Sequence, residues 1–403
     1  MRTIRIRRAN SGDREGTHRL DLSLPDELTA FGELMRRFVG RELIPLEGAM
    51  TEEGQLPEDV RQALAAKARE AGLWLLDVPE AHGGAGLGLL GMSIFWEEVS
   101  RTVAVPARDQ SIFGPMVGPI LLSLAGDLAE RYLHPVLRGE KRACFAQTEP
   151  DAGSDPRGLR TRAVREGDVY RVDGVKRFIT HADKADFAQV MVKTPAPDGG
   201  RERLTCLLVD MDSPGLRIAA RHRTMMGDSP CELVFDDVRV PVANRVGEEG
   251  DGFRLAQGWI NQGRIRHGAR ACGVAARCLD LTAAYAHQRK TFGQPLADRQ
   301  ALQWALADSH TELHATRLMV RHAAARMDRG EDTRLESYMV KLYGDEMGFR
   351  VADRCLQFHG GMGLTLDLPI QKFWRDQRSF MITEGPSEVM RMAIARHVLD
   401  EAA

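Results

Sequence analysis

The sequence lacks a paired-cysteine pattern, an excess of basic residues and a long apolar run. Its six cysteines are scattered over 403 residues and never form C-x-x-C, so we expect reduced thiols and a cytoplasmic location. A net charge of −2 gives no basic footprint for nucleic acid. No apolar segment approaches the length of a membrane span. These absences argue against a disulfide scaffold, a nucleic-acid-binding protein and a membrane-spanning protein.

The composition is that of a globular protein, with 43% hydrophobic and 28% charged residues. The length is enough for two or three domains with a sizeable core. Residues 1–23 are rich in arginine but have no apolar signal region, so a flexible extension is predicted there.

The hydrophobic pattern changes twice along the chain. Helical spacing dominates residues 24–142, alternation with a period of two dominates residues 143–247, and helical spacing returns over residues 248–403. The pattern predicts a multidomain α+β protein with an N-terminal helical domain, a middle β-barrel or sandwich, and a C-terminal helical domain. We find no internal repeat and no low-complexity segment.

Two details of this pattern make sharper predictions. The stretch "VYRVDGVKRFI" predicts two strands joined in a hairpin at Asp173-Gly174, because this pair tolerates positive φ. A seven-residue repeat of apolar side chains predicts the packed seam of a helix bundle, and its members are Leu306, Leu313, Val320 and Met327.

Two motifs invite a functional interpretation that their context does not support. The stretch "GLGLLG" fits the dinucleotide fingerprint, but no βαβ run surrounds it, and we expect a loop leading into a helix. The stretch "HTELH" places His310 and His314 on one helical face, but Thr311 stands where zinc peptidases carry their glutamate. A solvated helix face is the preferred interpretation of this histidine pair.

Two other stretches are better candidates for a site. The stretch "CFAQTEPDAGSD" lies where helices give way to strands, and its glycine and hydroxyl residues could donate hydrogen bonds to a phosphate or a heterocyclic ring. A cluster of Asx and Ser/Thr turns would have the same composition. The stretch "FMITEGPSEV" places Glu384 directly before a Gly-Pro break, with a new helix expected from Pro386 or Ser387. Both catalytic and plain surface-turn interpretations fit it.

Taken together, the sequence resembles the acyl-CoA dehydrogenase family over nearly its whole length. Eight stretches occur in the order and spacing of that family, namely "PEAHGGAGLG", "CFAQTEPDAGSD", "DGVKRFIT", "CELVFDDVRVP", "GEEGDGF", "QRKTFGQPL", "LQFHGGMG" and "TEGPSEV". The resemblance is strongest to the branch related to kinase-fused long-chain members, although no kinase domain is present. It implies an N-terminal helical domain, a middle β-barrel and a C-terminal four-helix bundle.

The resemblance also implies a reaction. Such enzymes oxidise an acyl-CoA thioester to the trans-2-enoyl-CoA, with a base removing the α-proton while the β-hydride passes to N5 of FAD. Glu384 matches the position of the base, and burial against flavin and acyl chain would raise its pKa. A minority of members carry the base at the position of Gly263, which has no side chain here. The resemblance therefore assigns catalysis to Glu384.

Further positions are assigned by the same resemblance. The FAD-binding residues on the strand domain would be Phe145, Gln147, Thr148, Gly153, Ser154, Phe178 and Thr180. Phe178 stands where tryptophan is commoner, and a place in the barrel core is its alternative interpretation. The substrate-binding residues would be Ser154, Arg264 and Gly385, and the backbone N–H of Glu384 would bind the thioester oxygen.

A second set of positions matches residues that reach the FAD of a neighbouring subunit. They are Arg289, Thr291, Gln300, Gln357, Gly360 and Gly361. This match implies a homodimer or homotetramer. Glu388 is also assigned to the cofactor-binding residues by this match. Pro386 and Glu388 depart from the commoner family residues, so a hydroxyl donor is lost at Pro386 and a negative charge would lie near the nucleotide at Glu388.

The expected partners are an acyl-CoA substrate and an electron-transfer flavoprotein as electron acceptor. Three alternatives remain at the level of sequence: an oxidase or flavin monooxygenase on the same fold, a non-catalytic flavin-binding member, and a nicotinamide dehydrogenase based on "GLGLLG" alone. An intact Glu384 argues against a monooxygenase. The stretch 107–122 falls where the family lines its acyl pocket, and its mixed residues do not define the acyl group.

Overall fold

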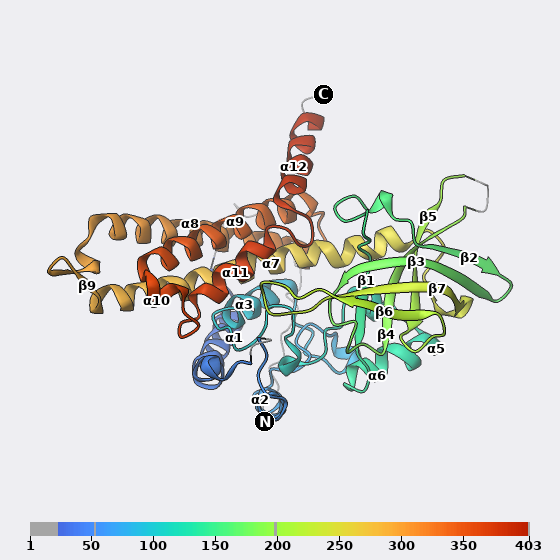
Figure 1. The fold of residues 1–403 in the computed structure, drawn as a ribbon, viewed down its shortest axis with the longest axis horizontal. Coiled ribbons are helices and arrows are strands. Elements are labelled where there is room, and N and C mark those ends of the chain that lie inside the picture. The colour runs from blue at the N-terminus through green and yellow to red at the C-terminus, as the bar shows by residue number, and fades with distance from the viewer. Residues whose placement is uncertain (1–22, 52–53, 197–199, 402–403) are drawn as a thin grey trace, which may run out of the picture.

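A computed structural model describes residues 23–51, 54–196 and 200–401. Residues 1–22 of the predicted N-terminal extension lie outside this range. The described chain is arranged as helices, then one sheet, then a long helical bundle (Figure 1). This order confirms the predicted fold class.

The N-terminal region consists of helices that bury one stripe each. In α1, Phe31, Met35 and Phe38 are buried at helical spacing, while acidic residues begin the helix and basic residues end it. The stretch "GLGLLG" forms a loop into α3, as predicted, and α3 is buried on nearly every side. The helices are α1 (Asp26–Phe38), α2 (Glu58–Glu70), α3 (Leu89–Val99), α4 (Pro119–Leu122), α5 (Gly126–Leu128) and α6 (His134–Leu137).

The middle region is one mixed sheet of eight strands. Its order is β6-β7-β3-β2-β4-β5-β8, with β1 added parallel to β4. The strands are β1 (Ala143–Ala146), β2 (Arg162–Glu166), β3 (Val169–Ile179), β4 (Phe187–Thr194), β5 (Arg203–Asp210), β6 (Leu216–Arg221), β7 (Cys231–Pro241) and β8 (Arg245–Val246). No hydrogen bonds join the edge strands β6 and β8 in the part of the chain that the structure describes, so the predicted barrel is not closed.

The predicted hairpin at Asp173-Gly174 is wrong. Strand β3 continues through both residues, and its register against β7 shifts between Val172 and Gly174, as in a β-bulge. Gly174 has a φ of 150°, and a Cβ there would overlap Thr161. The glycine therefore serves a close approach of two strands, and the true turn joins β2 to β3 at Gly167.

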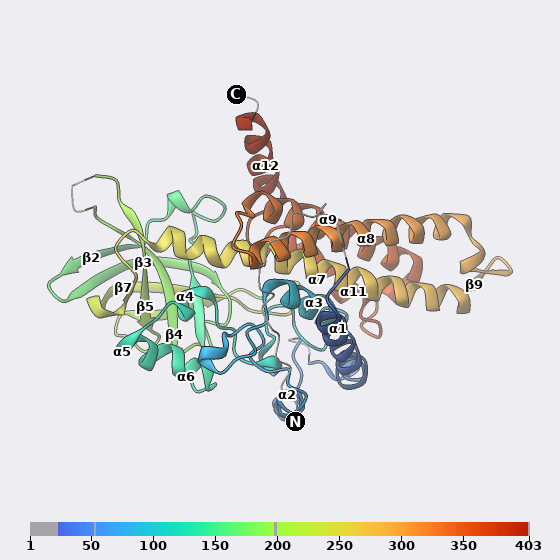
Figure 2. The ribbon, with the colours of Figure 1, turned by 180° about the vertical axis from the view of Figure 1, so that it is seen from behind.

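Helices α4 to α6 cover one face of the sheet, as the view from behind shows (Figure 2). Ile120 and Leu121 of α4, together with Tyr132 and Leu133 of the helical turn Ala129–Leu133 between α5 and α6, pack with apolar residues of β4 and β5. Strand β4 is buried along almost its entire length, which explains its continuous apolar run. All six cysteines are free and buried.

The C-terminal region is a bundle built on a 37-residue helix, α7. Gly268 of α7 and Gly344 of α9 lie against each other, so the two helices pack closely. The predicted seam on α8 is confirmed at its centre, where Leu313 and Val320 are buried. The elements are α7 (Gly252–Gln288), β9 (Lys290–Thr291), β10 (Gln294–Pro295), α8 (Gln300–Asp328), α9 (Arg334–His359), α10 (Gly361–Leu364), α11 (Ile370–Phe380) and α12 (Ser387–Glu401).

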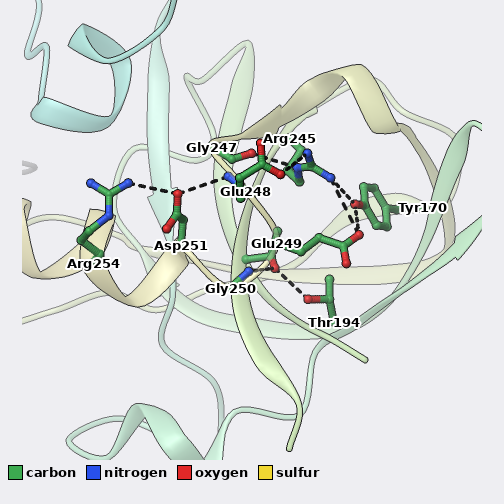
Figure 3. A network of polar contacts seen from close by, with 10 residues as sticks. Tyr170, Thr194, Arg245, Gly247, Glu248, Glu249, Gly250, Asp251 and Arg254 are labelled. Carbon is green, nitrogen blue, oxygen red and sulfur yellow. Dashed lines mark hydrogen bonds and ion pairs between the residues drawn. The ribbon is translucent and has the colours of Figure 1, made fainter. Parts of the chain in front are cut away.

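A polar network fixes the start of α7 to the sheet (Figure 3). The Tyr170 hydroxyl donates to Glu249, and Arg245 donates to Glu248 at 3.0 Å. The N–H of Gly250 donates to Thr205 Oγ1 at 3.0 Å. These bonds hold the loop "GEEGDGF" and thereby set the direction in which α7 leaves the sheet. Among the described residues, no helix is both long enough and apolar enough to cross a bilayer.

Candidate active site

Glu384 lies in the short connection between α11 and α12. Its backbone has a φ of 55° and that of Gly385 a φ of 101°, so two successive residues are left-handed. Helix α12 begins at Ser387, as the Gly-Pro break predicts. A left-handed conformation costs an L-residue about 1–2 kcal/mol. Such an outlier at a non-glycine residue is a reason to look for function there.

The two carboxylate oxygens of Glu384 have different surroundings. Oε1 accepts a hydrogen bond from Arg266 Nη2 at 2.8 Å and lies 3.6 Å from His267 Nε2. Oε2 is buried and has no hydrogen-bond partner among the described residues. It lies over Gly263, where an added Cβ would overlap it. Arg266 and His267 therefore fix one oxygen, while the other has no partner in the described part of the chain and can accept a proton.

A buried chain of charged groups continues behind Glu384. His267 Nδ1 lies 3.1 Å from Asp345 Oδ2, and Lys341 Nζ donates to the same oxygen at 2.9 Å. Lys341 also donates to the backbone carbonyl of Phe380 at 2.9 Å. Since Phe380 ends α11, this chain ties α7, α9 and the connection that carries Glu384 into one unit.

The pKa of Glu384 is shifted in the direction opposite to the one that burial alone would give. Burial raises the pKa, but Arg266, His267 and Arg270 outweigh it and hold the pKa well below its usual range. These three basic residues lie on one face of α7 in the stretch "RIRHGAR". The sequence-based expectation considered burial alone. The sequence does not show that Arg266, His267 and Arg270 lie close to Glu384 in the folded chain.

A cavity of about 270 Å³ adjoins Glu384 through Gly263 and Arg266. The residues that line it come from the loop before α3, from α3 itself, from residues 116–119, and from α7 and α8, and most of them are apolar. Met116, Val117 and Pro119 belong to the stretch 107–122 that the family resemblance places at the acyl pocket. The charged side chains on the wall are Asp77, Arg266 and Asp328.

These charged side chains have different tasks. Asp328 accepts hydrogen bonds from the N–H groups of Leu89 and Leu90 and so caps α3. The side chain of Asp77 is exposed, and it lines the cavity. The surrounding protein raises the pKa of Asp77 to about 6, with the nearby charge of Arg266 acting in the opposite direction.

Arg264 and Arg270 also lie near Glu384 on α7, and both are buried. Arg264 lies over the ring of Tyr338 at 4.6 Å and close to Gly385. Burial lowers the pKa of Arg270 to about 9, and Arg266 acts in the same direction. The Nε atoms of Arg264, Arg266 and Arg270 have no hydrogen-bond partner among the described residues. The site is thus rich in buried cationic donors.

The predicted cofactor positions Phe145, Gln147 and Thr148 lie at the end of β1 and directly after it, and Phe145 contacts the cavity wall. Phe145 stacks on Trp259 of the cavity wall at 5.8 Å between ring centroids. The carbonyl of Gln147 accepts from Lys176 at 3.0 Å, while Gln147 Oε1 is buried without a partner among the described residues. The carbonyl of Thr148 accepts from the N–H of Arg177 at 2.8 Å, which ties the segment after β1 to β3.

Phe178 lies on the surface and not in the core of the sheet, so that alternative interpretation is wrong. Its side chain is 55% exposed and its φ is 59°. It touches the ring of His222 edge-on at 5.1 Å. Thr180 follows at the end of β3 and is half-buried, while Gly153 and Ser154 are exposed in the loop after β1.

Sequence reasoning missed the ion pair that supports this loop. Lys176 Nζ lies 2.8 Å from Glu149 Oε1, and both side chains are buried. Glu149 also accepts from the N–H groups of Arg160 and Thr161 at 2.6 and 3.0 Å. Burial lowers the pKa of Lys176 to about 8, although Glu149 opposes this. Glu149 lies within the quoted loop motif, but sequence cannot show that a lysine of β3 pairs with it.

The remaining cofactor positions lie far from Glu384, at the other end of the bundle. Figure 1 shows β9 at the opposite end of α7 from the sheet. With a rise of about 1.5 Å per residue, the helix places Arg264 and Arg289 on the order of 35 Å apart. One group of predicted residues therefore lies at this end, namely Arg289, Thr291, Gln300, Gln357, Gly360 and Gly361. Glu388 is exposed in the first turn of α12.

Three family models match this chain, one in each of the three regions described above. Acyl-CoA dehydrogenase family models match residues 25–140 (N-terminal domain), 144–238 (middle domain) and 250–399 (C-terminal domain).

Individual relatives are similar over nearly their full length. The chain is 36% identical to (R)-benzylsuccinyl-CoA dehydrogenase of Thauera aromatica, over 95% of this chain and 98% of that protein. It is 34% identical to caffeyl-CoA reductase-Etf complex subunit CarC of Acetobacterium woodii, over 91% and 97%. A structure of glutaryl-CoA dehydrogenase from Mycobacterium smegmatis in complex with FADH2 matches with a TM-score of 0.82 and 26% identity, over 94% and 96%.

Proposed function

Because the chain belongs to the acyl-CoA dehydrogenase family, we propose that Glu384 is the base that converts an acyl-CoA thioester to the trans-2-enoyl-CoA. The protein is an oxidoreductase of the acyl-CoA dehydrogenase type, and its cofactor is FAD. The observation that carries the proposal is Glu384 Oε2, a buried carboxylate oxygen that has no hydrogen-bond partner among the described residues and lies over Gly263 of the cavity wall.

The free oxygen suits removal of an α-proton. Oε2 accepts the proton, while Arg266 and His267 hold Oε1 and so fix the plane of the carboxylate. The backbone N–H of Glu384 donates to the thioester oxygen, where negative charge develops as the proton leaves. Because Arg266 holds the pKa of Glu384 low, substrate binding has to weaken that contact before the carboxylate becomes an effective base.

The residues of β1 and β3 suit a flavin. Within the described part of the chain, Gln147 Oε1 is a buried acceptor without a partner, and a Cβ added at Gly153 would meet no atom within 4 Å. Phe178 offers an exposed ring on a strained backbone. Phe145, Thr148, Ser154 and Thr180 complete the group that would hold FAD from this side. FAD, when bound, supplies the acceptor for the β-hydride.

The distal group would hold the FAD of a second subunit. A distance on the order of 35 Å separates it from Glu384's end of α7, so one flavin cannot reach both groups of the same chain. The proposal therefore includes a homodimer or homotetramer in which Arg289, Gln300 and Gln357 serve a neighbour's cofactor. CarC is named as a subunit of a complex with Etf, which supports an electron-transfer flavoprotein as acceptor. A cytoplasmic location completes the proposal.

Anaerobic titration with a panel of acyl-CoAs tests the function. We expect an acyl-CoA to bleach the flavin of the wild-type protein, and Glu384→Gln to slow bleaching by about 10²- to 10⁴-fold. Glu27→Gln, on the exposed side of α1, is the matched control and keeps the wild-type rate. Rapid return of the oxidised flavin spectrum in air would show that oxygen is the electron acceptor, and the protein would then be an oxidase and not a dehydrogenase. A flavin that no acyl-CoA bleaches would overturn the proposal.

A further inference from the structure

The cavity beside Glu384 carries two charged groups that a hydrocarbon chain would leave unused. Asp77 and Arg266 project onto a wall that is otherwise formed mainly by leucine, methionine, valine, proline and tryptophan side chains. Charged groups against an apolar ligand lose hydration without gaining a partner, which costs free energy. An unsubstituted alkyl group can pack against the apolar side chains of this wall, but it cannot form a hydrogen bond or an ion pair with Asp77 or Arg266.

Arg266 has N–H donors that Glu384 does not use. Its side chain is 15% exposed, and Nη2 donates to Glu384 Oε1 at 2.8 Å. Its buried Nε has no hydrogen-bond partner in the described part of the chain. A guanidinium has five N–H donors in a planar fork, so it can bind a second oxygen beside the first. Among the described residues, Glu384 Oε1 is the acceptor found for Arg266, so a ligand could supply a second oxygen.

Asp77 offers the complementary group. It lies in the loop before Val78, and its exposed surface faces the same cavity. Asp77 and Arg266 both line this cavity, and the charge of Arg266 acts to lower the pKa of Asp77. Together they present hydrogen-bond donors and acceptors on one wall.

We propose that the acyl group taken by this site carries an oxygen substituent, a hydroxyl or a carboxylate, that Arg266 binds beside Asp77. This inference rests on the proposed function. A hydroxyl can accept from Arg266 and donate to Asp77, while a carboxylate can form a charge-assisted pair with Arg266. An unsubstituted chain offers no partner to Asp77 or to the donors of Arg266 that Glu384 does not use, and sites built for a polar group reject analogues that lack it.

The substituent also has a consequence for the base. The charge of Arg266 lowers the pKa of Glu384, and Arg266 would now share its donors with the ligand. Weakening the contact between Arg266 and Oε1 raises the pKa of Glu384 toward that of a useful base. The substituent thus selects the substrate and releases the base in one event.

The test compares three matched acyl-CoA series of equal chain length: unsubstituted, hydroxylated and carboxylated at the chain end. Dissociation constants come from the visible spectrum of the bound flavin, and rates come from anaerobic bleaching. We expect one substituted series to bind at least about tenfold more tightly than the unsubstituted one, which corresponds to about 1.4 kcal/mol.

Variants identify the source of the preference. Arg266→Met should abolish it, while Arg254→Met, an exposed position on the same helix, should retain it. Asp77→Leu should weaken binding of a hydroxylated chain, because the acceptor is lost. The same variant should strengthen binding of a carboxylated chain, because a like charge is removed. Thermal unfolding and flavin content establish that each variant is folded.

Two results would overturn the inference. The first is equal binding of the unsubstituted and substituted series by the wild-type protein. The second is an Arg266→Met variant that weakens all three series by the same factor, as a general packing defect would. Bleaching by unsubstituted acyl-CoAs without any preference sinks this inference alone. Bleaching by none of the series sinks the proposed function, and this inference with it.

Discussion

The carboxylate of Glu384 occupies the space that a side chain at Gly263 would need. An added Cβ at Gly263 would overlap Oε2, so the two positions cannot both carry a carboxylate in this arrangement. The family resemblance offers these same two positions for the base. The structure therefore makes them alternatives by simple exclusion of volume.

Gly263→Ala should displace Glu384 without removing it. A methyl group at this place pushes Oε2 away from the cavity, and misplacement of a catalytic group by about 1 Å can cost about 10²-fold in rate. Anaerobic flavin bleaching measures the loss. Gly258→Ala is the control, because an added Cβ at Gly258, on the same helix, meets no atom within 4 Å. Equal rates for the two variants would contradict the placement of the base.

Asp345→Asn should destabilise the bundle. Asp345 is the shared partner of His267 and Lys341, and all three side chains are buried. Loss of one charge from a buried pair typically costs about 3–5 kcal/mol, because the other charge stays without a partner. Urea unfolding measures the change in unfolding free energy. Asp308→Asn, at an exposed position of α8, should leave it unchanged. A loss as small as that of the control would show that Lys341 finds another partner.

Lys176 should make the protein more stable as the pH rises from about 8 to about 10.5. Burial lowers the pKa of Lys176 from 10.5 to about 8, so the unfolded chain binds this proton more tightly than the folded protein in that window. The unfolding free energy then rises by up to about 1.4 kcal/mol per pH unit. Urea unfolding of wild type and Lys176→Met at several pH values measures the difference.

The matched variant for this experiment is Lys184→Met, at an exposed position before β4. It should keep the wild-type slope, whereas Lys176→Met should flatten it. A slope that Lys176→Met leaves unchanged would mean that Lys176 holds its proton equally well in both states.

Arg289→Ala should weaken FAD binding and be rescued by a second chain. If Arg289 serves the cofactor of a neighbouring subunit, a chain that carries Arg289→Ala still supplies an intact Glu384. Mixing it with Glu384→Gln chains, followed by subunit exchange, should restore bleaching that neither variant shows alone. Arg329→Ala, at an exposed position at the opposite end of α8, is the control for FAD affinity. Failure of the mixture would place Arg289 outside the shared site.

The order of helices, strands and helices could be predicted because each region has its own hydrophobic period. The start of α12 was also predictable, because Gly385 and Pro386 interrupt any helix. The hairpin prediction failed at Gly174, where the glycine provides room for Thr161 across the sheet. A local turn signal cannot reveal that kind of neighbour.

In the candidate site, too, local sequence motifs could be recognised, whereas contacts between residues far apart in the sequence could not. Glu384 was found from its motif, but its contacts with Arg266 and His267 join residues more than a hundred positions apart. Those contacts reverse the direction in which burial alone would move the pKa of Glu384. Asp77 was not singled out, because an aspartate in a loop has no distinguishing pattern until a cavity forms around it.

The buried cysteines make this protein a convenient subject for site-specific labelling. Burial raises the pKa of Cys144 and Cys206 to about 12, and none of the six thiols is exposed. Because thiolates are the reactive species, labelling reagents would find little to attack on the native chain. A single substitution such as Trp304→Cys, at a position 62% exposed on α8, would then supply the one place where a dye attaches.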